Sequence, residues 1–345
     1  MDLVSVTERT TLVDPAGNSA EQLIEHRTDP LTGAVASINA ALGEKAKAFL
    51  GAPDVALLED LQEKSRAGCP FCAAAEKGTR FLPDLAPEGQ LRVGDALAMP
   101  NLFSKCALDA VVVVDPASHV LFPSRLSAKA LADAILASGE LLRRARKRDA
   151  AHVHHVVGMN FLHPGGSSVP HPHFQVHVRG VPYSGLARQM RAAGEFRART
   201  GRPFFDALLE AERGGARWVG TTGGVEWLAP FAPAHQKEVW GVLRGAASLA
   251  ELGRAEAEGF AAGIRRTVSF YEESGTHPFT FAFHSSPGLG KDAGWALLVK
   301  LCARPALRPL YSNYDTWFTP KFMGDDVHLE APEGWAARLR GRWGD

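Results

Sequence analysis

Three histidines and a glutamine occupy every second position of one short segment, Pro170-His-Pro-His-Phe-Gln-Val-His-Val178. Successive side chains of a β-strand point to opposite faces of the sheet. In a strand, the polar side chains of this segment would share one face: His171, His173, Gln175 and His177. Imidazole can act as a metal ligand, as an acid or base, or as a nucleophile, and its pKa of about 6.5 leaves it largely neutral at neutral pH. The row therefore predicts a chemical site and leaves those three roles open.

Two of the four cysteines form the sequence Cys69-Pro-Phe-Cys72, which has the spacing of a zinc knuckle. Two thiolates and two imidazoles complete a tetrahedral zinc site. One histidine of the row could supply one imidazole, and His119, which follows the apolar run 107–114, is the natural candidate for the other. A redox pair is the alternative, but no thioredoxin-like βαβ pattern surrounds these cysteines. The spacing thus favours a metal site.

Apolar periodicity predicts the elements that must position these residues. Short apolar or β-branched runs indicate strands, and apolar positions at helical spacing indicate helices. We expect strand segments at 92–99, 107–114, 152–162, 171–181, 217–231 and 278–303. We expect helices at 54–66, 126–147 and 248–274, with a polar helical connector at 186–215. Ser248 and Glu251 form a capping box that would begin the helix at 248–274.

This order of elements repeats along the chain, which predicts an α+β fold of two related halves. Each half would be an antiparallel sheet with a helix across one face. The segments Asn160-Phe-Leu-His-Pro-Gly165 and Phe283-His-Ser-Ser-Pro-Gly288 echo one another and support a duplication. We place the halves at 1–185, which carries the cysteines and the histidine row, and at 186–345.

Composition narrows the classes of partner. The 38 basic residues balance the 38 acidic residues of this 345-residue chain, so no net field selects nucleic acid or an anionic membrane. The N-terminal sequence has no signal-peptide pattern, and no apolar run approaches the roughly 18 residues of a membrane span. We therefore expect a cytoplasmic protein with no nucleic-acid or membrane partner.

The order of the motifs resembles the galactose-1-phosphate uridylyltransferase family: Cys-x-x-Cys, a histidine just beyond a strand, then His-Pro-His-x-Gln. That family belongs to the histidine-triad superfamily and contains two fused copies of its fold. Further similarity runs over about 24–300, in the segments 25–33, 100–103, 160–168, 227–231 and 279–284. The resemblance implies two fused histidine-triad-like halves, and a homodimer is the common assembly in the family.

The resemblance also assigns roles to individual residues. It implies a structural zinc ion with four ligands: Cys69, Cys72, His119 and His171. It makes His173 the nucleophile and Gln175 the residue that hydrogen-bonds the transferred phosphoryl group. Asn101 would belong to a nucleoside-binding turn, and Asn160 and Ser168 would contact the nucleotide phosphates. An acid–base role for His177 is a further alternative.

The implied reaction is a uridylyltransferase-like nucleotidyl transfer. His173 would attack the α-phosphorus of a nucleotide sugar such as UDP-glucose and expel the sugar phosphate. The nucleotidyl-histidine would then react with a second sugar 1-phosphate, which splits one displacement into two easier ones. The substrates implied are thus a nucleotide sugar and a sugar phosphate.

Several positions depart from the family pattern. Phe174 replaces a small residue, but its side chain would face away from the site. Segment 295–300 lacks the His-x-His pair that contributes to a second metal site in many members, so a second metal is not expected. Lys45 and Lys47 match the family's basic residues only in part, and 307–330 shows no match to its hexose-phosphate residues.

The identity of the base stays open. Asn101 is followed by Leu102 where uridylyl members typically carry Asp, which resembles the ADP-sugar phosphorylase branch of the family. His-Pro-His, in place of His-Ser-His, resembles the uridylyl branch. The alternatives are therefore an ADP-sugar phosphorylase or adenylyltransferase, or a zinc-stabilised nucleotide-binding protein without turnover.

Overall fold

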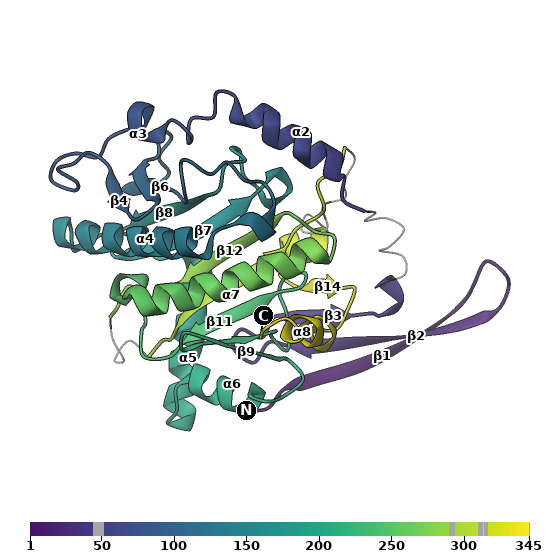
Figure 1. Cartoon of the computed structure of the whole chain (residues 1–345). Helices are drawn as coiled ribbons and strands as arrows, with labels where there is room; N and C mark the ends of the chain where they lie inside the picture. The colour runs from purple at the N-terminus through teal and green to yellow at the C-terminus, as the bar shows by residue number, and fades with distance from the viewer. Residues whose placement is uncertain (44–51, 290–293, 310–312, 314–316, 345) are drawn as a thin grey trace.

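One antiparallel sheet of ten strands forms the centre of the computed structural model, in the order β4-β5-β6-β8-β7-β12-β13-β11-β10-β9 (Figure 1). The structure describes residues 1–43, 52–289, 294–309, 313 and 317–344. Lys45 and Lys47 lie outside the described residues. The same sheet contains strands from both predicted halves, so the two halves share one framework.

Each half contributes five of these strands and one long helix. The first half supplies β4 (Leu91–Val93), β5 (Ala96–Pro100), β6 (Leu108–Val113), α4 (Ala128–Arg148), β7 (His154–Phe161) and β8 (His173–Arg179). The second half supplies β9 (Trp218–Thr222), β10 (Val225–Leu228), β11 (Val239–Leu243), α7 (Arg254–Glu273), β12 (Phe279–His284) and β13 (Leu297–Ala303). In both halves three strands, a helix and two strands follow one another in sequence.

The strand order shows that the two halves have the same topology. β8 lies between β6 and β7, and its counterpart β13 lies between β11 and β12. The halves meet where β7 pairs antiparallel with β12. The predicted α+β class with two related halves is confirmed. The sheet is continuous across the halves, and the boundary at 185/186 stays a proposal.

The helices α4 and α7 lie next to each other on one face of the sheet (Figure 1). Both bury apolar residues four positions apart: Leu131 and Ile135 on α4, and Phe260 and Ile264 on α7. This spacing aligns side chains on one face of a helix. These residues join the inward side chains of the sheet in one contiguous core cluster. The core therefore extends across both halves and supports β8 from behind.

Smaller elements surround this core. They are α2 (Val55–Arg66), α3 (Ala74–Lys77), α5 (Ser184–Thr200), α6 (Phe204–Glu212) and α8 (Pro332–Arg340). A second sheet has the order β1-β2-β3-β14, built from β1 (Val4–Val13), β2 (Ser19–Thr28), β3 (Val35–Ile38) and β14 (Asp326–His328). The β1–β2 hairpin extends beyond the body of the molecule, and every residue of β1 is exposed. None of the described helices is long and apolar enough to cross a membrane, and the cytoplasmic location stays a prediction.

Three local features differ from the sequence-based expectations. Segment 92–99 is a hairpin and not a single strand, because the chain turns at Gly94, which has a φ of +55°. Ser248 and Glu251 do form a capping box, but it caps a short 3-10 turn, and α7 begins only at Arg254. β11 has no counterpart in the prediction, because all of its residues are buried and show no alternation.

Two buried histidines are expected to make the fold sensitive to acid. His155 donates its Nδ1–H to the Val153 carbonyl at 2.9 Å, and its Nε2 lies 2.6 Å from the Ser285 hydroxyl. His328 donates its Nε2–H to the Pro233 carbonyl at 2.7 Å. Burial, which disfavours the charged ring, lowers the pKa of each histidine to about 4.

We expect the free energy of unfolding to fall as the pH drops from 7 to 5. An unfolded imidazole with a pKa of about 6.5 takes up a proton in this range and the two buried rings do not, so protons favour the unfolded chain. The stabilisation is complete above about pH 6.5, and each ring loses about 2 kcal/mol of it by pH 5. Urea denaturation at both pH values tests this. His328→Gln should show a smaller pH dependence than the wild type, and equal pH dependence in both would contradict the assignment.

Candidate active site and metal centre

The histidine row is a strand only from His173 onward. β8 begins there, and His171 precedes it in a bend. The predicted strand at 171–181 therefore starts two residues later than expected, because Pro172 has no N–H to extend the ladder. Phe174 points to the opposite face, as predicted, and packs edge to face on Phe281 with ring centroids 5.2 Å apart. Two successive histidines of the row can thus face different partners.

Four side chains gather beside the start of β8, with their ligand atoms within 4.8 Å of one another: Cys69, Cys72, His119 and His171. Nδ1 of His171 lies 3.6 Å from Sγ of Cys69 and 3.5 Å from Sγ of Cys72. Nδ1 of His119 lies 3.5 Å from Sγ of Cys72 and 3.1 Å from Nδ1 of His171. Ligands around a tetrahedral zinc ion stand about 3.6 Å apart for sulfur and nitrogen and about 3.3 Å apart for two nitrogens. The cluster has the dimensions and the donors of a zinc site.

The hydrogen bonds behind the two imidazoles orient their lone pairs toward the cluster. Nε2 of His171 lies 3.0 Å from the carbonyl oxygen of Asp115. A carbonyl only accepts, so this nitrogen carries the proton and Nδ1 is left as an acceptor. Nε2 of His119 lies 2.9 Å from the Ser65 hydroxyl. With Nε2–H of His119 donating there, two lone pairs face each other across 3.1 Å, an arrangement that a cation between them stabilises.

The pKa of the Cys72 thiol also indicates a site for a cation. Burial and the neighbouring Cys69 raise the pKa of Cys72 to about 11. Without a cation the Cys72 thiol stays protonated at neutral pH, and a zinc ion would displace protons on binding. Four protein ligands close a tetrahedral zinc site and leave no position for substrate. The residues therefore fit a structural zinc ion and not a catalytic one.

His173 is held in the tautomer that a nucleophile needs. Its Nδ1–H donates to the His171 carbonyl at 2.8 Å, which leaves the lone pair on Nε2. Within the described part of the chain, no hydrogen-bond partner is found for Nε2. The side chain is 5% exposed, and burial lowers the pKa of His173 below its usual value. The ring is therefore neutral and nucleophilic at neutral pH.

Phe71, inside the Cys-x-x-Cys loop, connects the metal cluster to His173. Its ring centroid lies 4.8 Å from that of His173 and 6.1 Å from that of His171. A phenylalanine between two possible metal ligands has no chemical signature, so sequence alone predicts no role for Phe71. Together with the hydrogen bond to the backbone carbonyl of His171, this contact holds the His173 ring against the Cys-x-x-Cys loop.

A cleft of about 720 Å³ lies in front of His173 and Gln175. Its walls include the loop that carries Cys69 and the turn after β5 at 100–103, and Ser168 lies at its border. The cleft thus brings together four of the predicted catalytic and substrate-binding residues: His173, Gln175, Asn101 and Ser168. Its volume suits a ligand of nucleotide-sugar size.

Two predicted candidates lie outside the lining of this cleft. Asn160 lies on β7, and its amide nitrogen is 3.4 Å from where a Cβ on Gly166 would be, so it borders the Gly-rich loop. His177 pairs with Asp109 across β6 and β8, and its Nε2 is 3.6 Å from the carboxylate, beyond hydrogen-bond range. Burial, opposed by the Asp109 charge, lowers the pKa of His177. Neither residue lines the cleft, and the contact of Asn160 with the nucleotide phosphates stays a prediction.

Asp109 holds the turn that borders the cleft, and it belongs to none of the motifs that indicate the site in the sequence. Its buried carboxylate accepts from the Asn101 side chain at 3.1 Å and from the Lys105 backbone N–H at 2.9 Å. The Lys105 ammonium lies 2.9 Å from the same carboxylate. Burial alone would raise the pKa of Asp109, but the bonds from Lys105 and Asn101 outweigh it and lower the pKa. A lone acid inside the apolar run 107–114 is the signal that could have indicated it.

Only the first half carries the histidine row. β13 is the counterpart of β8 and reads Leu-Leu-Val-Lys-Leu-Cys-Ala. Its Lys300 ammonium lies 4.2 Å above the Trp240 ring, a cation–π contact. The strand that carries the histidine row in the first half therefore carries no histidine in the second half.

Comparison with known proteins identifies the fold. No protein-family model matches the chain. An uncharacterized protein of Archaeoglobus fulgidus is 26% identical over 333 residues, 95% of each chain. An ADP-glucose phosphorylase of Arabidopsis thaliana, solved with bound ADP-glucose, has a TM-score of 0.70 at 15% identity and covers 92% of this chain and 98% of its own. A uridylyltransferase structure has a TM-score of 0.67 at 19% identity with 92% and 98% covered. The chain has the uridylyltransferase fold.

The uridylyltransferase fold covers nearly the whole chain, so both halves belong to it. A GalT-like protein of Arabidopsis thaliana has the same architecture, with a TM-score of 0.68 at 15% identity over 92% of this chain and 98% of its own. The predicted resemblance is thus confirmed for the fold. At these identities the fold alone is shared, and the reaction must be argued from the site itself.

Proposed function

We propose that this protein is a nucleotidyltransferase that moves a nucleoside monophosphate from a nucleotide sugar to a sugar 1-phosphate through a nucleotidyl-His173 intermediate. The state of His173 is the observation that carries the proposal. Its Nδ1 proton is held by the His171 carbonyl, and its Nε2 lone pair, at the wall of the cleft, has no hydrogen-bond partner among the described residues. The shared fold with a uridylyltransferase and an ADP-glucose phosphorylase supports this reaction class.

In the first step Nε2 of His173 attacks the α-phosphorus of the donor. A nitrogen–phosphorus bond forms, the bond from phosphorus to the sugar phosphate oxygen breaks, and the sugar 1-phosphate leaves with that electron pair. The ring becomes positively charged, and the Nδ1–H bond to the His171 carbonyl stabilises it. The Gln175 amide, two residues along the same strand face, donates to the phosphoryl oxygens as charge develops on them.

In the second step a phosphate oxygen of the acceptor attacks the same phosphorus. The nitrogen–phosphorus bond breaks and returns its electron pair to Nε2, so His173 is neutral again. The two half-reactions are the reverse of one another, which gives ping-pong kinetics. Ser168, which lines the cleft, would donate to a phosphate in either step.

Zinc, when bound by the four-residue cluster, would supply rigidity and no Lewis-acid chemistry, because all its positions are occupied by protein. Cys69 and Cys72 hold the loop that carries Phe71. His171 holds the backbone carbonyl to which His173 donates. The cluster therefore acts on catalysis by positioning the nucleophile.

The preferred donor in this proposal is UDP-glucose, with a hexose 1-phosphate as acceptor. An ADP-sugar phosphorylase or adenylyltransferase is the second candidate, because Leu102 follows Asn101 at the cleft, where uridylyl members of the resembled family typically carry Asp. Measuring kcat/KM for UDP-glucose and ADP-glucose, each with galactose 1-phosphate or inorganic phosphate, separates the two. Preference for ADP-glucose and phosphate would favour the second candidate. Binding of either donor without any turnover would favour a nucleotide-binding protein and contradict both.

Asp109→Asn is expected to raise KM for the nucleotide donor about tenfold while kcat changes less. The variant keeps the side-chain size but removes the charge that holds Lys105, a charge-assisted contact of about 1–2 kcal/mol. The turn at 100–103 would then lose its position at the cleft. Steady-state kinetics at a fixed acceptor concentration measures both constants. Asp95→Asn, which removes an exposed carboxylate paired with Lys129, is the matched control; equal KM values in both variants would rule out a positioning role for Asp109.

A further inference from the structure

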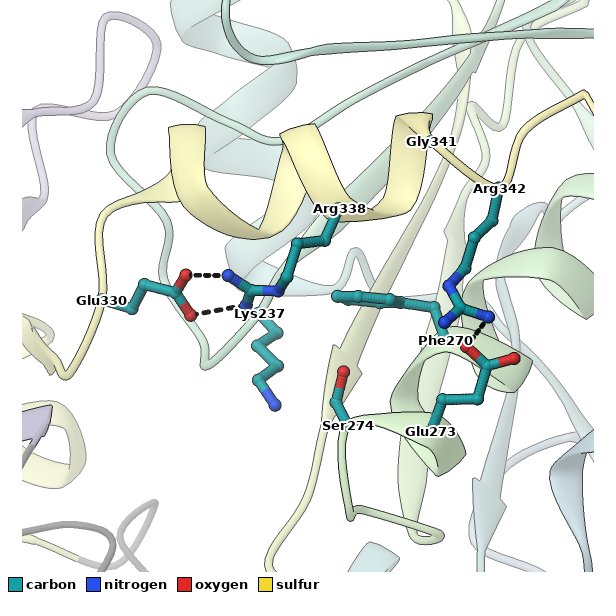
Figure 2. Close-up of a pocket in the computed structure, with 8 residues that line it drawn as sticks. All are labelled: Lys237, Phe270, Glu273, Ser274, Glu330, Arg338, Gly341 and Arg342. Atoms are coloured by element: carbon teal, nitrogen blue, oxygen red, sulfur yellow. Dashed lines mark hydrogen bonds and ion pairs between the residues drawn. The ribbon is translucent and has the colours of Figure 1, made fainter.

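A second pocket lies in the other half of the molecule, between the end of α7 and α8 (Figure 2). Its volume is about 710 Å³, within the range of small-molecule sites. Three basic and two acidic side chains line it, with the Phe270 ring among them: Lys237, Arg338, Arg342, Glu273 and Glu330. No residue of the catalytic cleft contributes to this lining.

The charges of the pocket do not cancel. Arg338 makes a paired contact with Glu330, with Nη2 2.8 Å from Oε2, and Arg342 forms an ion pair with Glu273. Figure 2 shows both pairs joined by dashed lines, while the Lys237 ammonium extends away from them. Among the residues that the structure describes, Lys237 has no hydrogen-bond or ion-pair partner for this ammonium. One positive charge is therefore left for a ligand.

The backbone of Lys237 is also strained. Its φ of +50° lies in the left-handed region, which is costly for a residue with a long side chain. The Tyr271 hydroxyl donates to its carbonyl at 2.7 Å and holds this conformation. Burial lowers the pKa of Lys237; the Glu330 charge opposes this shift, and the smaller effect of the Arg338 charge adds to it. If this residue had only a structural role, glycine or asparagine would adopt the left-handed conformation at a lower cost in free energy.

We propose that this pocket binds the phosphate group of a small phosphorylated metabolite, with the phosphate on Lys237 and the organic part against Phe270. Phosphate monoesters carry close to two negative charges at neutral pH, more than a carboxylate, and three cations line this pocket. Arg338 and Arg342 keep N–H groups beyond those used in their ion pairs, since a guanidinium has five. The site would respond to a metabolite independently of the catalytic cleft.

Amine acylation followed by mass spectrometry tests the site on the full chain, residue by residue. At an inorganic phosphate concentration about ten times its Kd, acylation of Lys237 should slow roughly tenfold. Lys64, an exposed lysine on α2, serves as the internal reference and should not change. Sodium chloride and sodium acetate at the same ionic strength are the comparison salts. Lys237 labelling that ignores phosphate, or that acetate slows equally, would overturn the proposal.

Lys237→Asn separates ligand binding from a structural role. Asparagine tolerates the left-handed conformation, so this variant should melt at a higher temperature than the wild type in phosphate-free buffer. Phosphate should raise the Tm of Lys237→Arg, which keeps the positive charge. It should raise the Tm of Lys237→Asn less. A lower Tm of Lys237→Asn without phosphate would mean that the lysine stabilises the C-terminal end of α7, and the binding site would then be rejected.

Discussion

His173→Ala is expected to lower kcat for nucleotidyl transfer by about 10⁴-fold or more. The imidazole is the group that bonds to phosphorus, and the alanine variant leaves the donor in the cleft with no nucleophile in its place. KM for the donor should change far less, because Gln175 and Asn101 remain at the cleft. Steady-state rates with the preferred donor and acceptor measure the loss.

His177→Ala is the matched control for this experiment. His177 lies on the same strand and the same face of β8, but it does not line the cleft. Its replacement should change kcat by less than about threefold, since it touches neither substrate nor His173. Zinc content and the circular dichroism spectrum should be unchanged in both variants. If His173→Ala kept more than about a hundredth of the activity, another residue would have to be the nucleophile.

Cys72→Ser is expected to remove the metal and destabilise the protein by at least about 5 kcal/mol, because metal binding and folding of such a loop are coupled. Sγ of Cys72 stands 3.5 Å from Nδ1 of His119 and from Nδ1 of His171, so its loss removes one of the four corners of the tetrahedron. Because Phe71 then loses its anchor beside His173, kcat should fall roughly tenfold or more. Metal analysis and urea denaturation of the purified protein measure the two effects.

Cys106→Ser controls for the loss of a thiol as such. Cys106 is half-buried and lies outside the metal cluster, with Sγ 3.1 Å from the Leu108 carbonyl. This variant should retain its zinc and most of its stability. Undiminished zinc in Cys72→Ser would show that the four-residue cluster is not the metal site. Loss of zinc with unchanged stability would contradict the structural role instead.

The repeated order of strands and helices could be predicted from sequence because each element carries its own periodicity. Alternation along 170–178 correctly separates Phe174 from His173, and helical spacing correctly predicts α4. β11 could not be predicted, since a strand buried on both faces shows no alternation. Periodicity also does not give strand order, so the insertion of β8 between β6 and β7 required the structure.

Part of the candidate site could likewise be predicted from the sequence, and part of it could not. Spacing predicts the cysteine pair and the histidine row, because those motifs are local in sequence. The contact of Asp109 with Asn101 and Lys105 depends on how a turn folds back on its strand, and periodicity does not encode it. The alternating pattern also suggests that the histidines of the row all face the same part of the site. The structure separates His171, which faces the cysteines, from His173, which faces the cleft, because the strand begins between them.

Lys237 is a second feature that sequence could not reveal. Nothing in its neighbours predicts a lysine with positive φ, and its pocket forms only when α7 and α8 meet. The two partner acids of the pocket lie far apart in the chain, at Glu273 and Glu330. Only the structure shows that these two acids pair with Arg342 and Arg338, which leaves the Lys237 charge without a partner among the described residues.

Trapping the covalent intermediate tests the central claim most directly. The protein is incubated with UDP-glucose or ADP-glucose labelled at the α-phosphorus, without acceptor, and then digested for mass spectrometry under alkaline conditions. We predict an acid-sensitive nucleotidyl group on the peptide that contains His173, absent from His173→Ala and discharged by a sugar 1-phosphate or by inorganic phosphate. No covalent label from either donor, or label that persists in His173→Ala, would contradict the mechanism.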